Sequence, residues 1–157
     1  SWNQADFGTF PGNIHEPFAV FTQTMKNSVP LIYSGQEEPV LRALEFFEKD
    51  PIVFKNFQRE KFYKTLLELR KRNSALSANT SFKKVPIGDE KAIYAFAREN
   101  GKQKVLVILN FSGSEQVIAI KDSSLSGKVF NVFEEKETIL STTERKIKPW
   151  GYEVYEY

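Results

Sequence analysis

The chain has 157 residues, of which 41% are hydrophobic and 14% aromatic, enough apolar material to pack one domain or one and a half. Its 22 Lys and Arg against 20 Asp and Glu give a net charge of +2, and the charges are interspersed, which argues against nucleic acid as a partner. No apolar run reaches membrane-spanning length, so no membrane partner is expected, and without cysteine there are no disulfides or thiolate metal sites.

The first predicted element is a helix. Residues 1–12 carry two breaks made of Gly and Pro and no periodicity, so they are expected to form a loop. The helix is predicted to begin near His15 and to end at Asn27. Its apolar face is formed by residues at i, i+3 and i+7, namely Phe18, Phe21 and Met25.

The next segment, residues 29–37, carries the most specific signal of the sequence. Leu31, Ile32 and Tyr33 are consecutive apolar residues, which is typical of a strand covered on both faces in a parallel sheet. Pro30 is tolerated only where such a strand begins. The run ends in a polar turn around Gly35, so this segment predicts a buried strand that leads into a site.

A long irregular excursion is expected between residues 38 and 57, punctuated by two prolines. Asn56 is predicted to cap a second helix over residues 58–72. The apolar stripe of this helix is formed by Phe62, Leu66 and Leu69.

From about residue 78 the composition changes to short β-branched and aromatic runs separated by turns that contain Gly or Asn. Strands are predicted over residues 91–98, 105–111, 115–120, 128–133, 138–140, 145–147 and 152–157. A spacing of about ten residues between short strands predicts a two-sheet antiparallel sandwich, which is expected to fold independently.

Residues 29–37, Val-Pro-Leu-Ile-Tyr-Ser-Gly-Gln-Glu, resemble the eighth-strand motif that closes the barrel in the α-amylase superfamily, glycoside hydrolase family 13. Ser28 stands where that family usually has Gly. Four further segments resemble family members in the same order: Ser-Trp-Asn at 1–3, Phe-Phe-Glu-Lys-Asp-Pro-Ile at 46–52, and the segments 62–71 and 148–155. The resemblance therefore spans the whole chain.

This resemblance implies an α+β chain in two parts. Residues 1–77 would hold the seventh helix, the eighth strand and the eighth helix of a catalytic (β/α)8 TIM barrel. Residues 78–157 would form the C-terminal antiparallel β-sandwich, of Greek-key type. The parent protein would be a retaining glycosidase that acts on α-1,4-glucans such as starch and maltooligosaccharides, and the chain would meet its α-glucan substrate through the parent's barrel.

The family's catalytic carboxylates lie on the fourth, fifth and seventh barrel strands, and retaining chemistry needs two of them about 5 Å apart. The third carboxylate belongs to an Asn-His-Asp motif that lies just before the Ser-Trp-Asn at which this sequence starts. The resemblance therefore implies no catalytic residue, no metal site and no cofactor in this segment, while a calcium ion in the parent stays open. The pair His15 and Glu16 could be taken for a degenerate copy of the motif, but no strand precedes it, and a lone surface His at a helix start is the better interpretation.

Three residues are candidates for positions near the substrate: Trp2, Gln36 and Glu37. Gln36 and Glu37 would follow the carboxyl end of a parallel strand, where barrel enzymes build their sites. The alternative is that Glu37 caps backbone amides of its own turn, with Gly35 at positive φ. Trp2 would stack on a sugar ring or anchor a loop. Glu38, next to Glu37, is expected to be solvated.

Two other functions are alternatives to the hypothesis that the chain is part of a glycoside hydrolase. The chain could be a non-catalytic carbohydrate-binding module or a purely structural cap. A row of exposed aromatic residues on the sandwich would favour binding. Self-association is also expected, because a strand at 31–33 would have no neighbour in this chain. A secreted or periplasmic parent fits the resemblance, and any export signal would lie upstream of Ser1.

Overall fold

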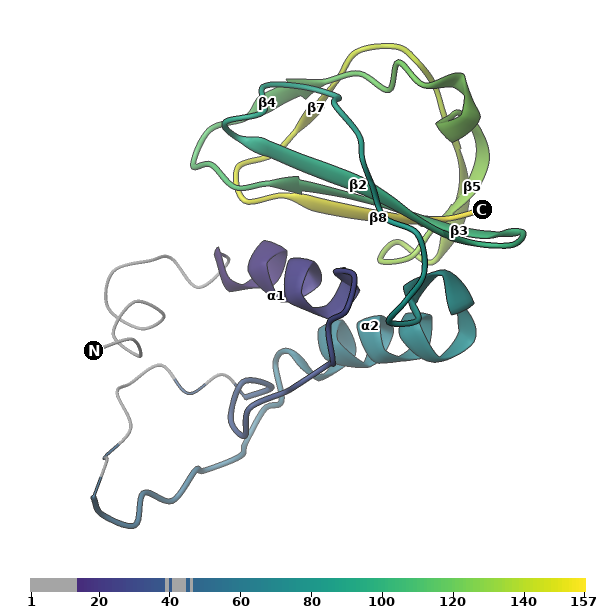
Figure 1. Ribbon diagram of the computed structural model, residues 1–157. Coiled ribbons are helices and arrows are strands. Elements are labelled where there is room, and N and C mark those ends of the chain that lie inside the picture. The colour runs from purple at the N-terminus through teal and green to yellow at the C-terminus, as the bar shows by residue number, and fades with distance from the viewer. Residues whose placement is uncertain (1–13, 39, 41–44, 46) are drawn as a thin grey trace.

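A computed structural model describes residues 14–157 except residues 39, 41–44 and 46 (Figure 1). The helical elements of the first half are α1 (His15–Thr24), α2 (Glu60–Arg72) and the short 3-10 helix η3 (Ser74–Leu76). The second half contains β1 (Lys83–Lys84), β2 (Ile93–Asn100), β3 (Gln103–Asn110), β4 (Gln116–Ile118), the 3-10 helix η4 (Ser123–Leu125), β5 (Gly127–Asn131), β6 (Lys136–Leu140), β7 (Arg145–Ile147) and β8 (Tyr152–Glu156).

The strands form two antiparallel sheets, so the predicted antiparallel sandwich is confirmed in outline. One sheet has the order β1-β2-β3-β8-β5-β6, and the other pairs β4 with β7. The predicted strand bounds differ from the observed ones by at most two residues, but β1 was missed because it consists of two exposed lysines. β8 lies between β3 and β5, so the end of the chain joins the two halves of the larger sheet.

The larger sheet is covered on both faces, because successive residues of a strand point to opposite sides. In β3, Val105, Val107 and Leu109 join α1 and α2 in a helix-side core, whereas Leu106 and Ile108 lie in an inter-sheet core with residues of β4 and β7. All five side chains are fully buried. Figure 1 shows the resulting layers: two helices, the large sheet, and the small sheet.

Both helices start close to their predicted positions. α1 begins at His15 as predicted, while α2 begins two residues late, and its N-cap is Arg59, which makes no side-chain cap bond. The predicted cap Asn56 is therefore wrong. The Arg59 amide instead donates to the carbonyl of Glu37 at 2.9 Å, so the preceding turn satisfies an amide at the start of α2.

The apolar face of α1 is packed against the sheet. The Phe21 ring lies 5.5 Å from that of Tyr94 and 5.9 Å from that of Phe111, both edge to face. Met25 also packs on the helix-side core. Phe18 remains about half exposed, although its ring lies 4.7 Å from Phe111. The helix face that a half-barrel would leave uncovered is thus largely covered by the β-domain, which we define as residues 78–157.

The strand predicted at residues 31–33 is not formed. Residues 28–33 belong to neither helix nor sheet. Val29, Leu31 and Tyr33 are exposed, whereas Ile32 packs on the helix-side core, so burial alternates along the segment. The prediction of burial on both faces is wrong for this chain, because no neighbouring strand from the described residues forms a ladder with the segment. The barrel remnant predicted for residues 1–77 is accordingly not seen as a barrel.

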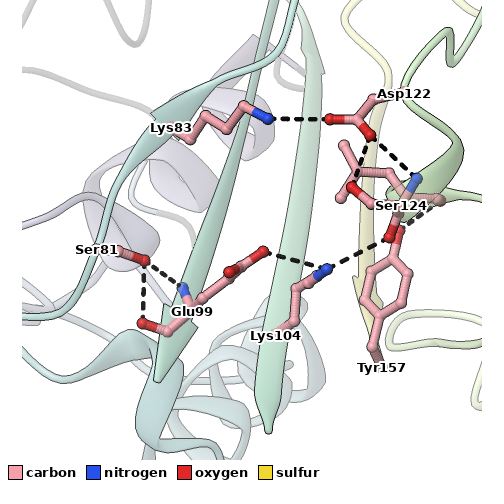
Figure 2. A network of polar contacts seen from close by, with 8 residues as sticks. Ser81, Lys83, Glu99, Lys104, Asp122, Ser124 and Tyr157 are labelled. Atoms are coloured by element: carbon pink, nitrogen blue, oxygen red, sulfur yellow. Dashed lines mark hydrogen bonds and ion pairs between the residues drawn. The ribbon is translucent and has the colours of Figure 1, made fainter. Parts of the chain in front are cut away.

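Polar contacts join the strands at one end of the large sheet (Figure 2). Lys83 of β1 lies 3.0 Å from the carboxylate of Asp122, and Lys104 of β3 lies 3.1 Å from Glu99 of β2. Asp122 also accepts hydrogen bonds from the hydroxyl and amide of Ser124 in η4. The Ser124 hydroxyl and Lys83 lower the pKa of Asp122 to about 2. The network therefore connects η4 to the edge of the large sheet.

Candidate functional site

The predicted site lies in a tight turn over residues 34–38, directly after the extended segment. The Gln36 amide donates to the Tyr33 carbonyl at 2.9 Å, and the Val40 amide donates to the Gly35 carbonyl at 3.0 Å. Gly35 has φ +95°, and a Cβ there would lie 2.7 Å from Val40 Cγ2. Both observations require glycine at this position.

The structure brings two of the three candidate residues, Gln36 and Glu37, into this turn. Gln36 Oε1 accepts from the Tyr33 amide at 2.8 Å, and Glu37 Oε2 accepts from the Gly35 amide at 3.0 Å. Both side chains thus bind the backbone of their own turn. This geometry matches the alternative in which Glu37 caps a backbone amide of its own turn. Trp2 lies outside the described residues.

Glu38 is the residue that sequence reasoning missed. It is only 9% exposed, and its carboxylate accepts hydrogen bonds from the amides of Lys55, Asn56 and Phe57 at 3.0 to 3.2 Å. The amides of Lys55 and Phe57 lower the pKa of Glu38. The expectation of a solvated carboxylate was therefore wrong. The signal was available, because adjacent side chains point apart and one of two neighbouring glutamates can face inward.

Aromatic side chains lie beside the segment that Glu38 holds. The rings of Phe54 and Phe57 are stacked 5.5 Å apart with planes 11° from parallel, and both rings are exposed. Phe57 has φ +46°, an uncommon conformation for a bulky residue, and Glu38 binds its amide. The site thus offers amide and carboxylate groups near aromatic surface. Among the described residues of this turn, Glu37 and Glu38 are not a free acid and nucleophile pair, since both carboxylates bind backbone amides.

His15 is not a lone surface residue. Its Nε2 atom is hydrogen-bonded to the hydroxyl of Tyr63, so it joins the start of α1 to α2. The neighbouring Glu16 lies near the hydroxyl of Tyr152, whose pKa is raised first by burial and then by this carboxylate. His15 and Glu16 thus both hold α1 in place. The prediction that His15 is a lone surface residue was wrong.

The β-domain lacks the surface expected of a carbohydrate-binding module. Its exposed large hydrophobic residues are Val117 and Ile139, and neither is aromatic. Trp150 is half-buried beside Gly113, and its amide donates to the Ser112 carbonyl at 3.0 Å. Trp150 therefore packs on a neighbouring turn, and the row of exposed aromatic residues that would favour sugar binding is missing from residues 83–157.

In the part of the chain that the structure describes, no group of three or more His, Cys, Asp or Glu residues is arranged to hold a metal ion. No helix in the same part has the length and apolar character needed to cross a bilayer.

Residues 93–151, from the start of β2 to the turn before β8, match the family model of the α-amylase SusG C-terminal domain. This stretch is therefore similar to the C-terminal domain of an α-amylase. No curated protein matches the chain. The match covers most of the two-sheet region, and the first half of the chain lies outside the matched residues.

Solved amylase structures resemble almost the whole chain. A noncanonic maltogenic α-amylase AmyB from Thermotoga neapolitana has a TM-score of 0.76 at 16% identity, over 96% of this chain and 37% of that one. A γ-CGTase from Alkalophilic bacillus clarkii has a TM-score of 0.74 at 16% identity, over 96% and 24%. AmyP in complex with maltose has a TM-score of 0.70 at 11% identity, over 95% and 35%. These identities establish the fold alone, and the chain spans 24–37% of the length of these structures.

Proposed function

We propose that the chain is the C-terminal part of an α-amylase-like glycoside hydrolase that acts on α-1,4-glucans. In this proposal residues 1–77 complete a catalytic (β/α)8 barrel, and residues 78–157 form the capping sandwich. The observation that carries it is the extent of the fold likeness, which covers 96% of the chain and so reaches beyond the α-amylase C-terminal domain into the first half.

The exposed residues of the first half support this division. We call residues 29–57 the open segment. Most of the exposed large hydrophobic residues of the described chain lie in it: Val29, Leu31, Tyr33, Phe47, Val53, Phe54 and Phe57. Exposed apolar residues gathered in one region indicate a surface that another part covers. The remaining barrel strands would cover the outward face of residues 29–33 and pair with its backbone.

The chemistry would then come from upstream of this chain. A retaining glycosidase needs an acid and a nucleophile about 5 Å apart across the scissile bond. Glu37 and Glu38 cannot serve as that pair while their carboxylates bind the amides of Gly35 and of residues 55–57. We assign Trp2, Gln36 and Glu37 to the rim of the glucan cleft, where they orient substrate or hold the loop that does.

The proposal is tested by assaying the full-length polypeptide and the isolated chain with a chromogenic maltooligosaccharide. The full-length protein should hydrolyse it and release product with retained α configuration, and the isolated chain should not. A full-length protein without activity on α-glucans would contradict the proposal. In calorimetry the isolated chain should give no saturable heat with maltoheptaose. Saturation that is lost in Trp150→Ala would instead favour a carbohydrate-binding module.

A further inference from the structure

Two arginines from distant elements converge on the C-terminal end of α1. Arg70 of α2 donates from one terminal nitrogen to the carbonyl of Gln23 at 3.0 Å, and Arg98 of β2 donates to the carbonyl of Thr24 at 2.8 Å. The last turn of α1 contains no basic residue of its own. The carbonyl end of a helix carries partial negative charge, so both cations lie where the helix favours them.

Arg98 joins α1 to the β-domain. It is fully buried, and its other hydrogen bonds go to the carbonyls of Ser77 and Ser81 and to the hydroxyl of Thr80, at 2.6 to 2.9 Å. One side chain of β2 thus holds both the end of α1 and the connection that runs from η3 to β1.

Arg70 holds the start of the open segment. Its guanidinium donates to the hydroxyl of Ser28 at 3.2 Å and to the carbonyl of Ser28 at 2.5 Å. Ser28 immediately precedes the extended residues 29–33. A second contact fixes the same region, because Gln23 Nε2 donates to the carbonyl of Leu31 at 3.2 Å. The end of α1 therefore positions the backbone that leads to the turn at residues 34–38.

Arg70 and Arg98 are two cations that lie close enough to repel each other. Burial, followed by repulsion from Arg70, lowers the pKa of Arg98. In the described part of the chain, every acceptor of either guanidinium is a carbonyl or hydroxyl oxygen. Simple packing would be served by apolar side chains at no electrostatic cost. A planar guanidinium, in contrast, fixes several acceptors at defined directions.

We propose that Arg70 and Arg98 are positioning residues that together fix residues 27–38 relative to the large sheet. The β-domain, through Arg98, and helix α2, through Arg70, together set the position of the turn that carries Gln36 and Glu37. The relevance of this turn to a glucan cleft rests on the proposed function, whereas the positioning itself does not.

The test is amide hydrogen exchange on the isolated chain, for the wild type, Arg70→Met, Arg70→Lys and Arg98→Lys. Four amides that donate to backbone carbonyls report on the positioned region: Asn27, Ser28, Gln36 and Glu38. Arg70→Met and Arg98→Lys should speed their exchange by about tenfold or more, because each loses hydrogen bonds to a charged donor. Arg70→Lys should restore part of the protection. The amides of residues 105–109 should exchange as in the wild type.

Arg72→Met is the matched control, because Arg72 lies on the same helix and binds Glu156 of β8 instead of α1. It should leave the four reporter amides unchanged. The proposal is overturned if Arg72→Met matches Arg70→Met, if residues 105–109 exchange faster by the same factor, or if the reporters keep wild-type rates. None of these readouts depends on enzymatic activity, so failure of the proposed function would leave the result intact.

Discussion

The helix-side core and the open segment contain similar apolar side chains in opposite environments. Val107 and Leu109 of β3 are fully buried between helices and sheet, whereas Val29 and Leu31 are 83% and 76% exposed. The difference comes from neighbours, because β3 has β2 and β8 on its two edges and residues 29–33 have no strand beside them. Apolar sequence alone therefore does not make a buried strand, since the strand also needs its pairing partners within the chain.

The largest effect is expected on the folding of the β-domain when it is produced without the first half of the chain. Residues 78–157 lack α1 and α2, which cover Phe96, Val105, Val107, Leu109 and Val154. Exposing five such side chains costs about 1.5–3 kcal/mol each, which is comparable with a domain's net stability of about 5–15 kcal/mol. Contrary to the expectation from sequence, this fragment should therefore not fold cooperatively.

Circular dichroism and a denaturant titration of residues 78–157 would measure this. A sharp unfolding transition close to that of the whole chain would show that the helices are dispensable and that the shared core contributes little.

A matched pair of substitutions tests the contrast directly. Leu109→Ala removes a fully buried side chain and should lower the free energy of unfolding by about 2–5 kcal/mol. Leu31→Ala makes the same chemical change at an exposed site and should cost less than about 0.5 kcal/mol. Urea unfolding of both variants gives the comparison. Equal losses would mean that Leu31 is covered in solution, as it would be in an oligomer.

Sequence patterns predicted strands most accurately where the residues that pack on a strand lie in the same chain. The pairing strands β2 and β3 were predicted from β-branched and aromatic runs separated by a turn, and Gly101 in that turn has φ +59°. Residues 31–33 were predicted less well, because consecutive burial requires strands that the described residues do not supply. Arg98 gave no signal, since a charged residue in an alternating strand normally points to solvent, and its acceptors become neighbours only on folding.

A smaller effect is expected when the exposed residues 29–33 are changed, and it concerns the self-association of the chain. We propose that the chain self-associates, with the outward face of residues 29–33 as the contact. Leu31→Lys places a charge on that face, which disfavours edge pairing. Light scattering over a concentration series should show the wild type associating and the variant remaining monomeric. A wild type that stays monomeric at all concentrations would show that the open segment needs no partner.

The smallest expected effect is a loosening of residues 55–57 at low pH, caused by protonation of Glu38. The amides of Lys55 and Phe57 hold the pKa of Glu38 below its ordinary value of 4.5. A carboxylate with a lowered pKa in the folded state stabilises that state above its unfolded pKa, and this contribution is lost as the pH falls through the folded pKa. Acidification below about pH 4.5 should therefore loosen residues 55–57 before the β-domain unfolds.

Amide protection factors of Lys55, Asn56 and Phe57, measured by NMR between pH 7 and pH 3, would follow this loosening. Glu38→Gln should reproduce the acid state at pH 7, because a neutral amide oxygen is a weaker acceptor than a carboxylate. Asp122→Asn is the matched control, since Asp122 also has a lowered pKa but binds Lys83 and Ser124 at the edge of the sheet. It should leave residues 55–57 unchanged. Unchanged protection of these residues in Glu38→Gln would mean that Phe54 and Phe57 hold the segment without the carboxylate.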